Sequence, residues 1–225
     1  MLWYYDVTFY TFFVSQESGV TSFSELEGRR INTGGTGSIL HLVTMDLLED
    51  LGLSVSFYNA VKAEAGNAYV NRQIVGMPSA AAVPDGFLLQ MNASLPIHVL
   101  SMTDEEIAAV MQGKPFYIKS IIPAGSPYNN TDPIQTIGYM QGGAASTALS
   151  QEDGYRIVSA MYSREAIEIW GPTMPSAADR DFVELMSNSP VPIHAGAIQY
   201  IESLGRLDEI PPHLIPAEYV PTTPR

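Results

Sequence analysis

The sequence predicts an α/β fold, because strand-like and helix-like segments alternate around one glycine-rich turn. A short apolar strand at 30–33 leads into the turn at 34–38, and a second strand follows at 54–58. Between them, the predicted helix at 38–51 carries one apolar face, formed by Leu40, Val43, Leu47 and Leu51. Strands joined by a helix pair in parallel, and open α/β sheets bind ligands beyond the carboxyl ends of such strands. The turn lies at that position.

The composition is that of a globular protein with a strongly acidic surface. The 225 residues are 46% hydrophobic, which is enough for one or two ordinary cores. The chain has 11 basic and 24 acidic residues, and the net charge of −13 argues against nucleic acid or an anionic membrane as a partner. With no cysteine, disulfides and thiolate metal sites are excluded. No apolar run approaches the roughly 20 residues that a membrane-spanning helix needs.

The first 14 residues predict one or two buried strands, because they are rich in aromatic and β-branched side chains. This stretch lacks the basic segment and the small-residue cleavage site of a signal peptide, and Asp6 interrupts it. A chain that opens directly in a core strand is expected to be truncated.

The middle of the chain predicts further alternating elements. Thr103 and Glu106 form a capping box at the start of a helix. The other expected elements are a helical turn at 22–26, a helix at 63–69, a strand end and loop at 73–83, strands at 96–102 and 134–139, and an apolar stretch followed by turns at 114–131.

The last third is helical in pattern. Residues 144–148 are expected to lead into a helix that Ser150 caps, followed by helices at 164–170, 177–186 with Ser176 as cap, and 194–204. Five prolines after Arg206 predict an extended, mobile tail. The predicted division is 1–149 for a hinge strand and an α/β lobe, 150–205 for supporting helices, and 206–225 for a proline-rich tail.

The glycine-rich turn is the candidate ligand site. Gly34, Gly35 and Gly37 let backbone N–H groups approach a ligand closely, and Thr36 and Ser38 add hydroxyls. The N-terminus of the following helix adds unpaired N–H groups that favour a carboxylate or a phosphate. The spacing matches neither a nucleotide P-loop nor G-x-G-x-x-G, so nucleotide binding is disfavoured.

No credible catalytic or metal site is present in the sequence. The four histidines, His41, His98, His194 and His213, are scattered at spacings unlike a metal site. Ser38 has neither a nucleophile elbow nor an obvious base, and the acidic residues 104–106 suit a helix N-terminus. Arg29, Arg30 and Arg72 are the expected cations nearest the cleft. Of these, Arg72 is the candidate bidentate partner of an organic acid.

Several segments occur in an order that resembles the TAXI family, the solute receptors of TRAP transporters. They are Ser-Gly-Val at 18–20, Ser-Glu-Leu-Glu-Gly-Arg-Arg-Ile-Asn-Thr-Gly from 24, Gly-x-Gly-Ser before the helix, Phe-Tyr-Ile-Lys-Ser-Ile-Ile-Pro-Ala-Gly from 116, and Val-Pro-Ile-His-Ala-Gly-Ala-Ile-Gln-Tyr from 191. The resemblance covers residues 8 to 205. It implies a type II periplasmic-binding-protein fold, represented here by the second lobe and the C-terminal helices, with the first lobe incomplete.

The resemblance also implies a function. Such a protein is a periplasmic receptor that performs no chemistry, needs no cofactor or metal, and delivers a small organic acid or amino-acid-like carboxylate, of the glutamate class for example, to a TRAP permease. The implied ligand loop is Gly35, Thr36, Gly37 and Ser38, with Gly76 and Pro78 lining the cleft. An effector-sensing domain or an enzyme on the same two-lobed fold is the alternative. An isolated half of a cleft is expected to bind weakly, and exposed C-terminal helices are expected to permit self-association.

Overall fold

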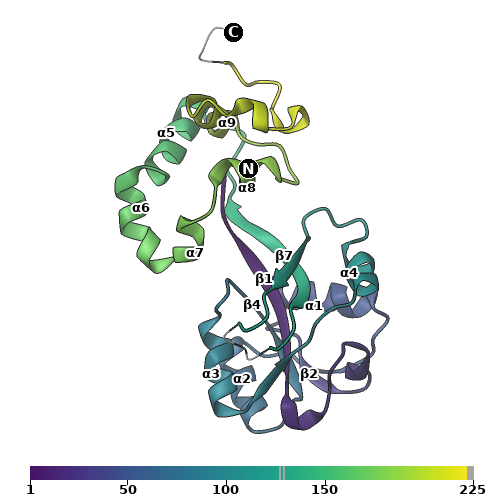
Figure 1. Cartoon of the computed structure of the whole chain (residues 1–225). Coiled ribbons are helices and arrows are strands. Elements are labelled where there is room, and N and C mark those ends of the chain that lie inside the picture. Colours follow the sequence, from purple (N-terminus) through teal and green to yellow (C-terminus); the bar gives the residue numbers. More distant parts are fainter. Residues whose placement is uncertain (127, 129, 222–225) are drawn as a thin grey trace. The chain divides into compact units, whose positions relative to one another are not determined.

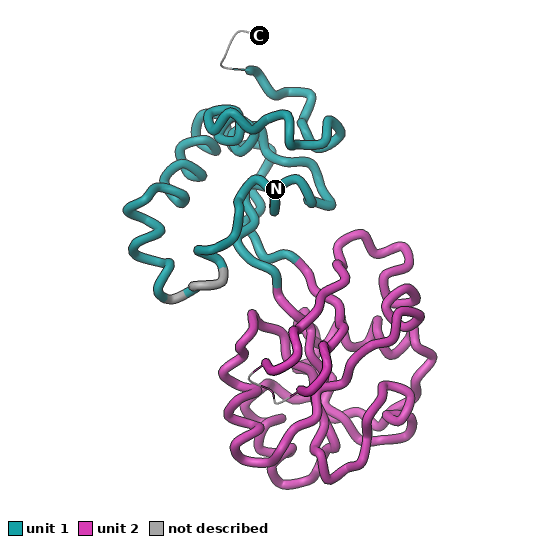
Figure 2. Tube along the Cα trace, in the orientation of Figure 1, with its two compact units in different colours: residues 1–7, 140–225 teal, residues 8–139 magenta. Residues whose placement is uncertain are grey.

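The computed structural model describes residues 1–126, 128 and 130–221, and these form two compact units (Figure 2). Unit 1 consists of residues 1–7 and 140–225, and unit 2 of residues 8–139. The predicted boundary was at residue 149. The observed division falls inside two long strands instead, so each of these strands contributes residues to both units.

The strands of the described residues form one sheet in the order β3-β2-β4-β1-β7-β6, with β5 paired to β1. Their bounds are β1 Trp3–Ser15, β2 Arg30–Asn32, β3 Ser56–Tyr58, β4 Gly76–Ala81, β5 Ile97–Val99, β6 Ile118–Ile122 and β7 Ile134–Gly143. The parallel pairing of β2 with β3, Ile31 opposite Phe57, confirms the predicted β-α-β unit. Strand β1 runs antiparallel to β4, with Phe12 opposite Pro78. The aromatic N-terminus is thus one long strand.

Four helices accompany the sheet among the described residues of unit 2: α1 Ile39–Asp50, α2 Lys62–Val70, α3 Gly86–Ser94 and α4 Asp104–Met111. Ser38 caps α1 by accepting a hydrogen bond from the His41 N–H at 3.2 Å. The predicted capping box of Thr103 and Glu106 is confirmed at α4. Helix α3 has no predicted counterpart, because Pro84 and Gly86 near its start are typical of turns.

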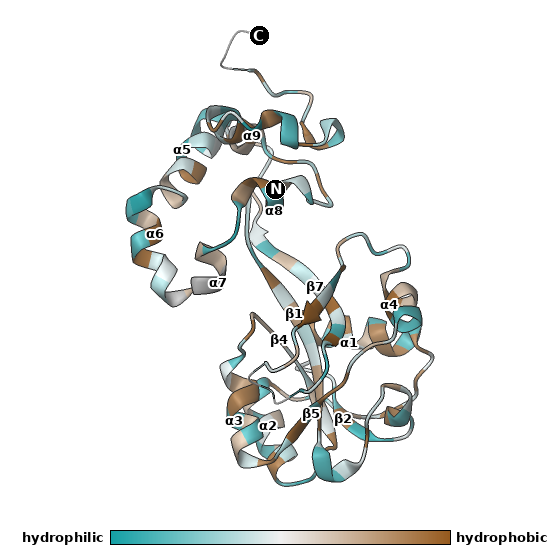
Figure 3. Ribbon diagram, in the orientation of Figure 1, coloured by the Kyte–Doolittle hydropathy of each residue, from teal (hydrophilic) through white to brown (hydrophobic). Residues whose placement is uncertain are grey.

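Two apolar cores lie on the two faces of the sheet in unit 2. Side chains alternate along β1, so that Tyr10, Phe12 and Val14 join one core and Phe13 joins the other. Helices α1 and α4 cover the first face, and α2 and α3 cover the second (Figure 1). Figure 3 shows apolar residues along the central strands between them. This layering confirms the α/β class.

Unit 1 contains helices α5 Gln151–Met161, α6 Arg164–Trp170, α7 Pro175–Ala178, α8 Phe182–Ser187 and α9 Ala195–Ser203. Helices α5 and α9 pack closely because Gly154 and Gly196 face each other. A Cβ atom on Gly196 would lie 2.4 Å from the Tyr155 nitrogen. His194 caps α9, with Nδ1 accepting from the Gly196 N–H at 3.1 Å.

Residues 144–148 lead into α5, which Ser150 caps by accepting from the Asp153 N–H at 3.1 Å, as predicted. Two other predictions for this unit are wrong. The predicted helix at 177–186 is two short helices, α7, which contains Ser176, and α8, which Asp181 caps through the Glu184 N–H at 3.0 Å. The chain breaks there because Asp181 bonds to a nearby N–H group and so favours a new helix start.

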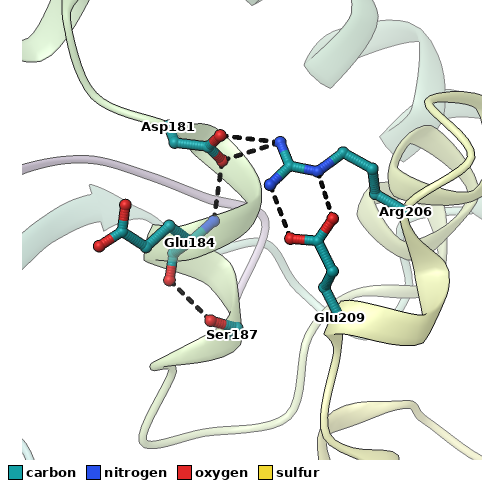
Figure 4. Close-up of polar contacts among 5 residues, drawn as sticks. All are labelled: Asp181, Glu184, Ser187, Arg206 and Glu209. Carbon is teal, nitrogen blue, oxygen red and sulfur yellow. Dashed lines mark hydrogen bonds and ion pairs between the residues drawn. The ribbon is translucent and has the colours of Figure 1, made fainter.

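The predicted extended tail is also wrong over residues 207–214. Two short 3-10 turns, Leu207–Glu209 and Pro212–Leu214, occupy this stretch, and Ile210 and Leu214 are buried. Proline is tolerated in the first turn of a helix, where its missing N–H has no partner to lose. Arg206 binds both Asp181 and Glu209, which holds the first of these turns against α8 (Figure 4).

Candidate functional site

The candidate site is the edge of the sheet at which the parallel strands β2, β3 and β4 end, which we call the carboxyl edge. Three connections leave the sheet there: residues 33–38 lead to α1, residues 59–61 to α2, and residues 82–85 to α3. The edge therefore gathers the starts of three helices. Open α/β sheets place ligand sites at this position because backbone N–H groups and loop side chains converge there.

The first connection is the glycine-rich turn, which the structure places at the carboxyl edge as predicted. Gly34 and Gly37 have φ values of 97° and 80°, the left-handed region that glycine adopts without strain. Thr36, Gly37 and Ser38 are exposed. The Ser38 N–H donates to the Gly35 carbonyl at 3.0 Å, which closes the turn. The structure thus brings Gly35, Thr36, Gly37 and Ser38 together at the N-terminus of α1.

Buried polar groups hold the base of this turn against the second connection. The Thr33 hydroxyl donates to Asn59 Oδ1 at 2.6 Å and lies 3.1 Å from His41 Nδ1. Asn32 Oδ1 accepts from the Ala60 N–H at 2.9 Å. Asn32 and Thr33 are both buried, and the bond of Asn32 to the Ala60 N–H is shielded from water. The turn and residues 59–61 are therefore held as one assembly.

The third connection adds a second polar cluster, centred on the buried Asp85. Its carboxylate accepts from the Ser79 hydroxyl at 2.5 Å and from the Phe87 N–H at 2.9 Å, which caps α3. Lys62 Nζ lies 3.6 Å from Asp85 Oδ2 and 4.5 Å from the centre of the Phe87 ring. The Tyr128 hydroxyl accepts from the Asp85 N–H at 2.6 Å, and burial raises the pKa of Tyr128 above its ordinary value. Lys62 is thus a cation at the carboxyl edge.

Gly76 and Pro78, the other residues implied by the family resemblance, lie inside β4. Gly76 begins the strand, and a Cβ atom there would lie 2.5 Å from the Phe13 carbonyl oxygen. Pro78 is buried opposite Phe12. The close approach of β1 explains the glycine at position 76. Gly76 lies at the start of β4, away from the glycine-rich turn.

Arg72 lies at the opposite edge of the sheet from the glycine-rich turn, because it precedes β4 and the turn follows β2. Its guanidinium binds the Glu17 carboxylate, with Nε to Oε1 at 2.5 Å and Nη2 to Oε2 at 3.1 Å. Arg29 and Arg30 lie at that same edge, at the start of β2. These three arginines were expected to be the cations nearest the site, but the structure places them at the opposite edge of the sheet.

Sequence reasoning missed Asn59, Lys62 and the role of His41. Asn59 and Lys62 follow β3 directly, so the rule that singled out the glycine-rich turn after β2 would also have marked them. His41 was set aside because it lies far from the other histidines in the sequence. In the structure its Nδ1 lies 3.1 Å from the Thr33 hydroxyl, a contact that the spacing of histidines in the sequence does not reveal.

Other site types are not found in the described residues. Residues 1–126, 128 and 130–221 contain no cluster of three or more histidine, aspartate or glutamate side chains that could hold a metal ion. Across the same part of the chain, no helix has both the length and the apolar character that crossing a bilayer requires.

Several solved structures are similar to this chain at low identity. The periplasmic aliphatic sulphonate binding protein SsuA from Escherichia coli is 12% identical, with a TM-score of 0.46, over 93% of this chain and 60% of that one. An ancestral arginine-binding protein bound to arginine is 13% identical, with a TM-score of 0.43, over 76% of this chain and 61% of that one.

A periplasmic binding protein of an ABC transporter from Brucella ovis, with glutathione bound, is 11% identical, with a TM-score of 0.39, over 84% of this chain and 51% of that one. The chain thus spans between half and two thirds of the length of these structures. No curated protein matches the sequence. The profile of the NMT1-like family matches residues 1–205, nearly the whole chain, and the protein belongs to that family.

Proposed function

We propose that this protein is a solute-binding receptor of the periplasmic type that binds a small organic acid or an amino acid through its carboxylate. The observation that carries the proposal is the glycine-rich turn at the carboxyl edge, with Thr36, Gly37 and Ser38 exposed at the N-terminus of α1. Backbone N–H groups and a helix dipole at one point favour an anion. The site residues that we propose are Gly35, Thr36, Gly37 and Ser38.

The receptor is proposed to act without chemistry and without a cofactor. The polar groups at the carboxyl edge are engaged in holding the turn and the caps of α1 and α3. Among the described residues, the one hydroxyl there that contacts an imidazole, that of Thr33 beside His41, is buried and donates its proton to Asn59, so it is engaged in holding the turn. Binding followed by release to another protein is the function that such a site supports.

The proposed partner is a membrane permease, of the TRAP type in view of the TAXI-like segments at 24–38, 116–125 and 191–200. Uptake of radiolabelled L-glutamate and succinate should fall in cells that lack the gene. Dissipating the ion gradient should abolish the remaining receptor-dependent uptake. Uptake that instead follows cellular ATP would contradict the TRAP partner and leave the receptor role in place.

Binding is tested on the purified chain by calorimetry and thermal shift with L-glutamate, succinate and other amino acids and dicarboxylates. Thr36→Ala should weaken binding about ten- to a hundredfold, because a hydrogen bond to a charged group contributes roughly 1.5–3 kcal/mol. Ser24→Ala is the matched control. Ser24 is exposed and its hydroxyl bonds only Ser22 among the described residues, at the opposite edge of the sheet. Equal effects of the two substitutions, or no binding of any acid, would contradict the proposal.

Self-association through the C-terminal helices remains a proposal. Ile157 of α5 and Ile169 of α6 are exposed apolar side chains, with 38% and 78% of their surface accessible. Light scattering at high protein concentration should show dimers or larger species. A monomer under those conditions would contradict this proposal and would leave ligand binding unaffected.

A further inference from the structure

Asn59 follows β3 at the carboxyl edge, and a hydrogen-bond relay fixes the orientation of its amide. The Thr33 hydroxyl, which is completely buried, donates its one proton to Asn59 Oδ1 at 2.6 Å. The second contact of this hydroxyl, with His41 Nδ1 at 3.1 Å, must then have His41 as the donor. The relay therefore runs from the His41 N–H to the Thr33 oxygen, and from the Thr33 hydroxyl to Asn59.

This relay determines which way the Nδ2 group of Asn59 points. Because Oδ1 accepts from Thr33, the Nδ2 group of Asn59 presents its two N–H donors on the other side. Asn59 is exposed, and none of the residues described in the structure accepts a hydrogen bond from its Nδ2. A side chain held in one orientation loses little entropy when it binds a ligand.

The amide lies beside the glycine-rich turn. A Cβ atom built on Gly35 would be 3.3 Å from Cγ1 of Val61, so the connection from β3 to α2 packs against the turn. Lys62 begins α2 directly afterwards and adds a positive charge. Two connections of the carboxyl edge thus place N–H donors next to each other, and the Lys62 ammonium lies 3.6 Å from Asp85 of the third.

We infer that Asn59 Nδ2 donates a hydrogen bond to the bound acid, and that Thr33 and His41 are positioning residues that hold it for this contact. The inference rests on the proposed function and adds a ligand contact from the second connection. It requires the ligand to present an acceptor, such as a carboxylate oxygen, between the glycine-rich turn and Asn59.

The contact is tested by NMR on ¹⁵N-labelled protein titrated with L-glutamate and with succinate. The side-chain NH₂ resonances of Asn59 should shift together with the backbone resonances of Gly35–Ser38. Asn59→Asp keeps an acceptor for Thr33 but removes both N–H donors and adds a negative charge, so affinity should fall about tenfold or more. Asn67→Asp, an equal charge change on the exposed side of α2, should leave affinity within about twofold.

The relay is tested separately and without any acid. The imidazole ¹⁵N spectrum of His41 should show the tautomer with the proton on Nδ1. Thr33→Val, which has a similar shape and no hydroxyl, should shift the Asn59 NH₂ resonances and weaken binding several-fold, and Thr33→Ser should restore both.

The outcomes separate the two proposals. Shifts at Gly35–Ser38 with an unmoved Asn59 amide would overturn the inference and leave the receptor function standing. A His41 proton on Nε2, or Thr33→Ser behaving like Thr33→Val, would overturn the positioning roles. If no resonance responds to any acid, the proposed function fails and the inference fails with it.

Discussion

At the scale of single residues, close contacts with neighbouring atoms decide what Gly76 does. Gly76 was expected to line a cleft, but it lies where β1 and β4 come together, and a Cβ atom there would lie 2.5 Å from the Phe13 carbonyl oxygen and 2.7 Å from Val14 Cγ1. Both neighbours are buried and cannot move easily. The glycine is needed for packing between these strands.

Gly76→Ala should therefore lower the free energy of unfolding by about 1–3 kcal/mol, the usual cost of overpacking a close contact. Chemical denaturation followed by circular dichroism measures this change. Gly86→Ala is the control, because nothing lies within 4 Å of a Cβ atom there and the residue is helical. The control should be neutral or stabilise slightly. A Gly76→Ala protein as stable as the wild type would refute the close approach of β1 to β4.

At the scale of elements, side-chain caps set where helices begin. The capping box of α4 joins the Thr103 hydroxyl to the Glu106 N–H at 3.2 Å, and Glu106 Oε2 to the Thr103 N–H at 2.8 Å. Such local motifs are readable from sequence because all of their atoms lie within one turn. The caps at Ser38, Ser150 and His194 were predictable for the same reason.

Thr103→Ala should destabilise the protein by about 1 kcal/mol, because one N–H group of the first turn loses its acceptor. Thr103→Ser keeps the hydroxyl and should remain within a few tenths of the wild type. Hydrogen exchange of the α4 amides locates the effect. If Ser and Ala at position 103 behave alike, the hydroxyl is not the cap.

Arg206 links two elements of unit 1 through carboxylates. It donates to Asp181 at 2.8 and 3.0 Å and to Glu209 at 2.6 and 2.7 Å (Figure 4). These hydrogen bonds hold the pKa of Asp181 and the pKa of Glu209 below their ordinary values, and the Glu184 N–H adds to the effect on Asp181. Carboxylates with lowered pKa values stabilise the fold above their ordinary pKa, and the contribution is lost as the pH falls through the lowered pKa.

Arg206→Gln should therefore lower the melting temperature at pH 7, and the difference from the wild type should shrink as the pH falls below about 4. Melting curves across this range measure it. Arg156→Gln is the control, since it breaks an exposed pair with Glu152 on the surface of α5 and should change the melting temperature little at any pH. A difference that stays constant down to pH 2 would mean that the two carboxylates do not contribute.

At the scale of the whole molecule, the chain divides into two units with separate interiors. Both large apolar cores belong to unit 2, whereas unit 1 depends on the close packing of α5 with α9. Structural units with separate cores can open independently. The strands β1 and β7 are the segments that contribute to both units.

Gly196→Ala should destabilise unit 1 selectively, because its Cβ atom would meet backbone atoms of α5 at 2.4–2.6 Å. Hydrogen–deuterium exchange should speed up in α5 and α9 and stay unchanged in α1 and β2. Gly171→Ala serves as the control within the same unit, since the nearest atom to its Cβ would lie at 3.4 Å, an ordinary contact. A uniform increase across both units would show that the chain unfolds as one cooperative block.

The sequence by itself determined the features that depend on neighbouring residues. Aromatic and β-branched side chains marked β1, the glycine-rich turn marked the start of α1, and hydroxyl caps marked α4 and α5. The α/β class followed from strand and helix order alone. These signals are local, because they need only the periodicity and the caps of one element.

Only the tertiary structure decided which residues share an edge of the sheet. Arg72 and Gly76 are close in sequence but lie at the edge opposite the glycine-rich turn, whereas Asn59 joins Thr33 across 26 positions of sequence. Strand order and direction determine these neighbours, and both depend on long-range packing of β1 against β4 and of β2 against β3. Which distant residues meet at one edge is therefore decided only when the sheet has formed.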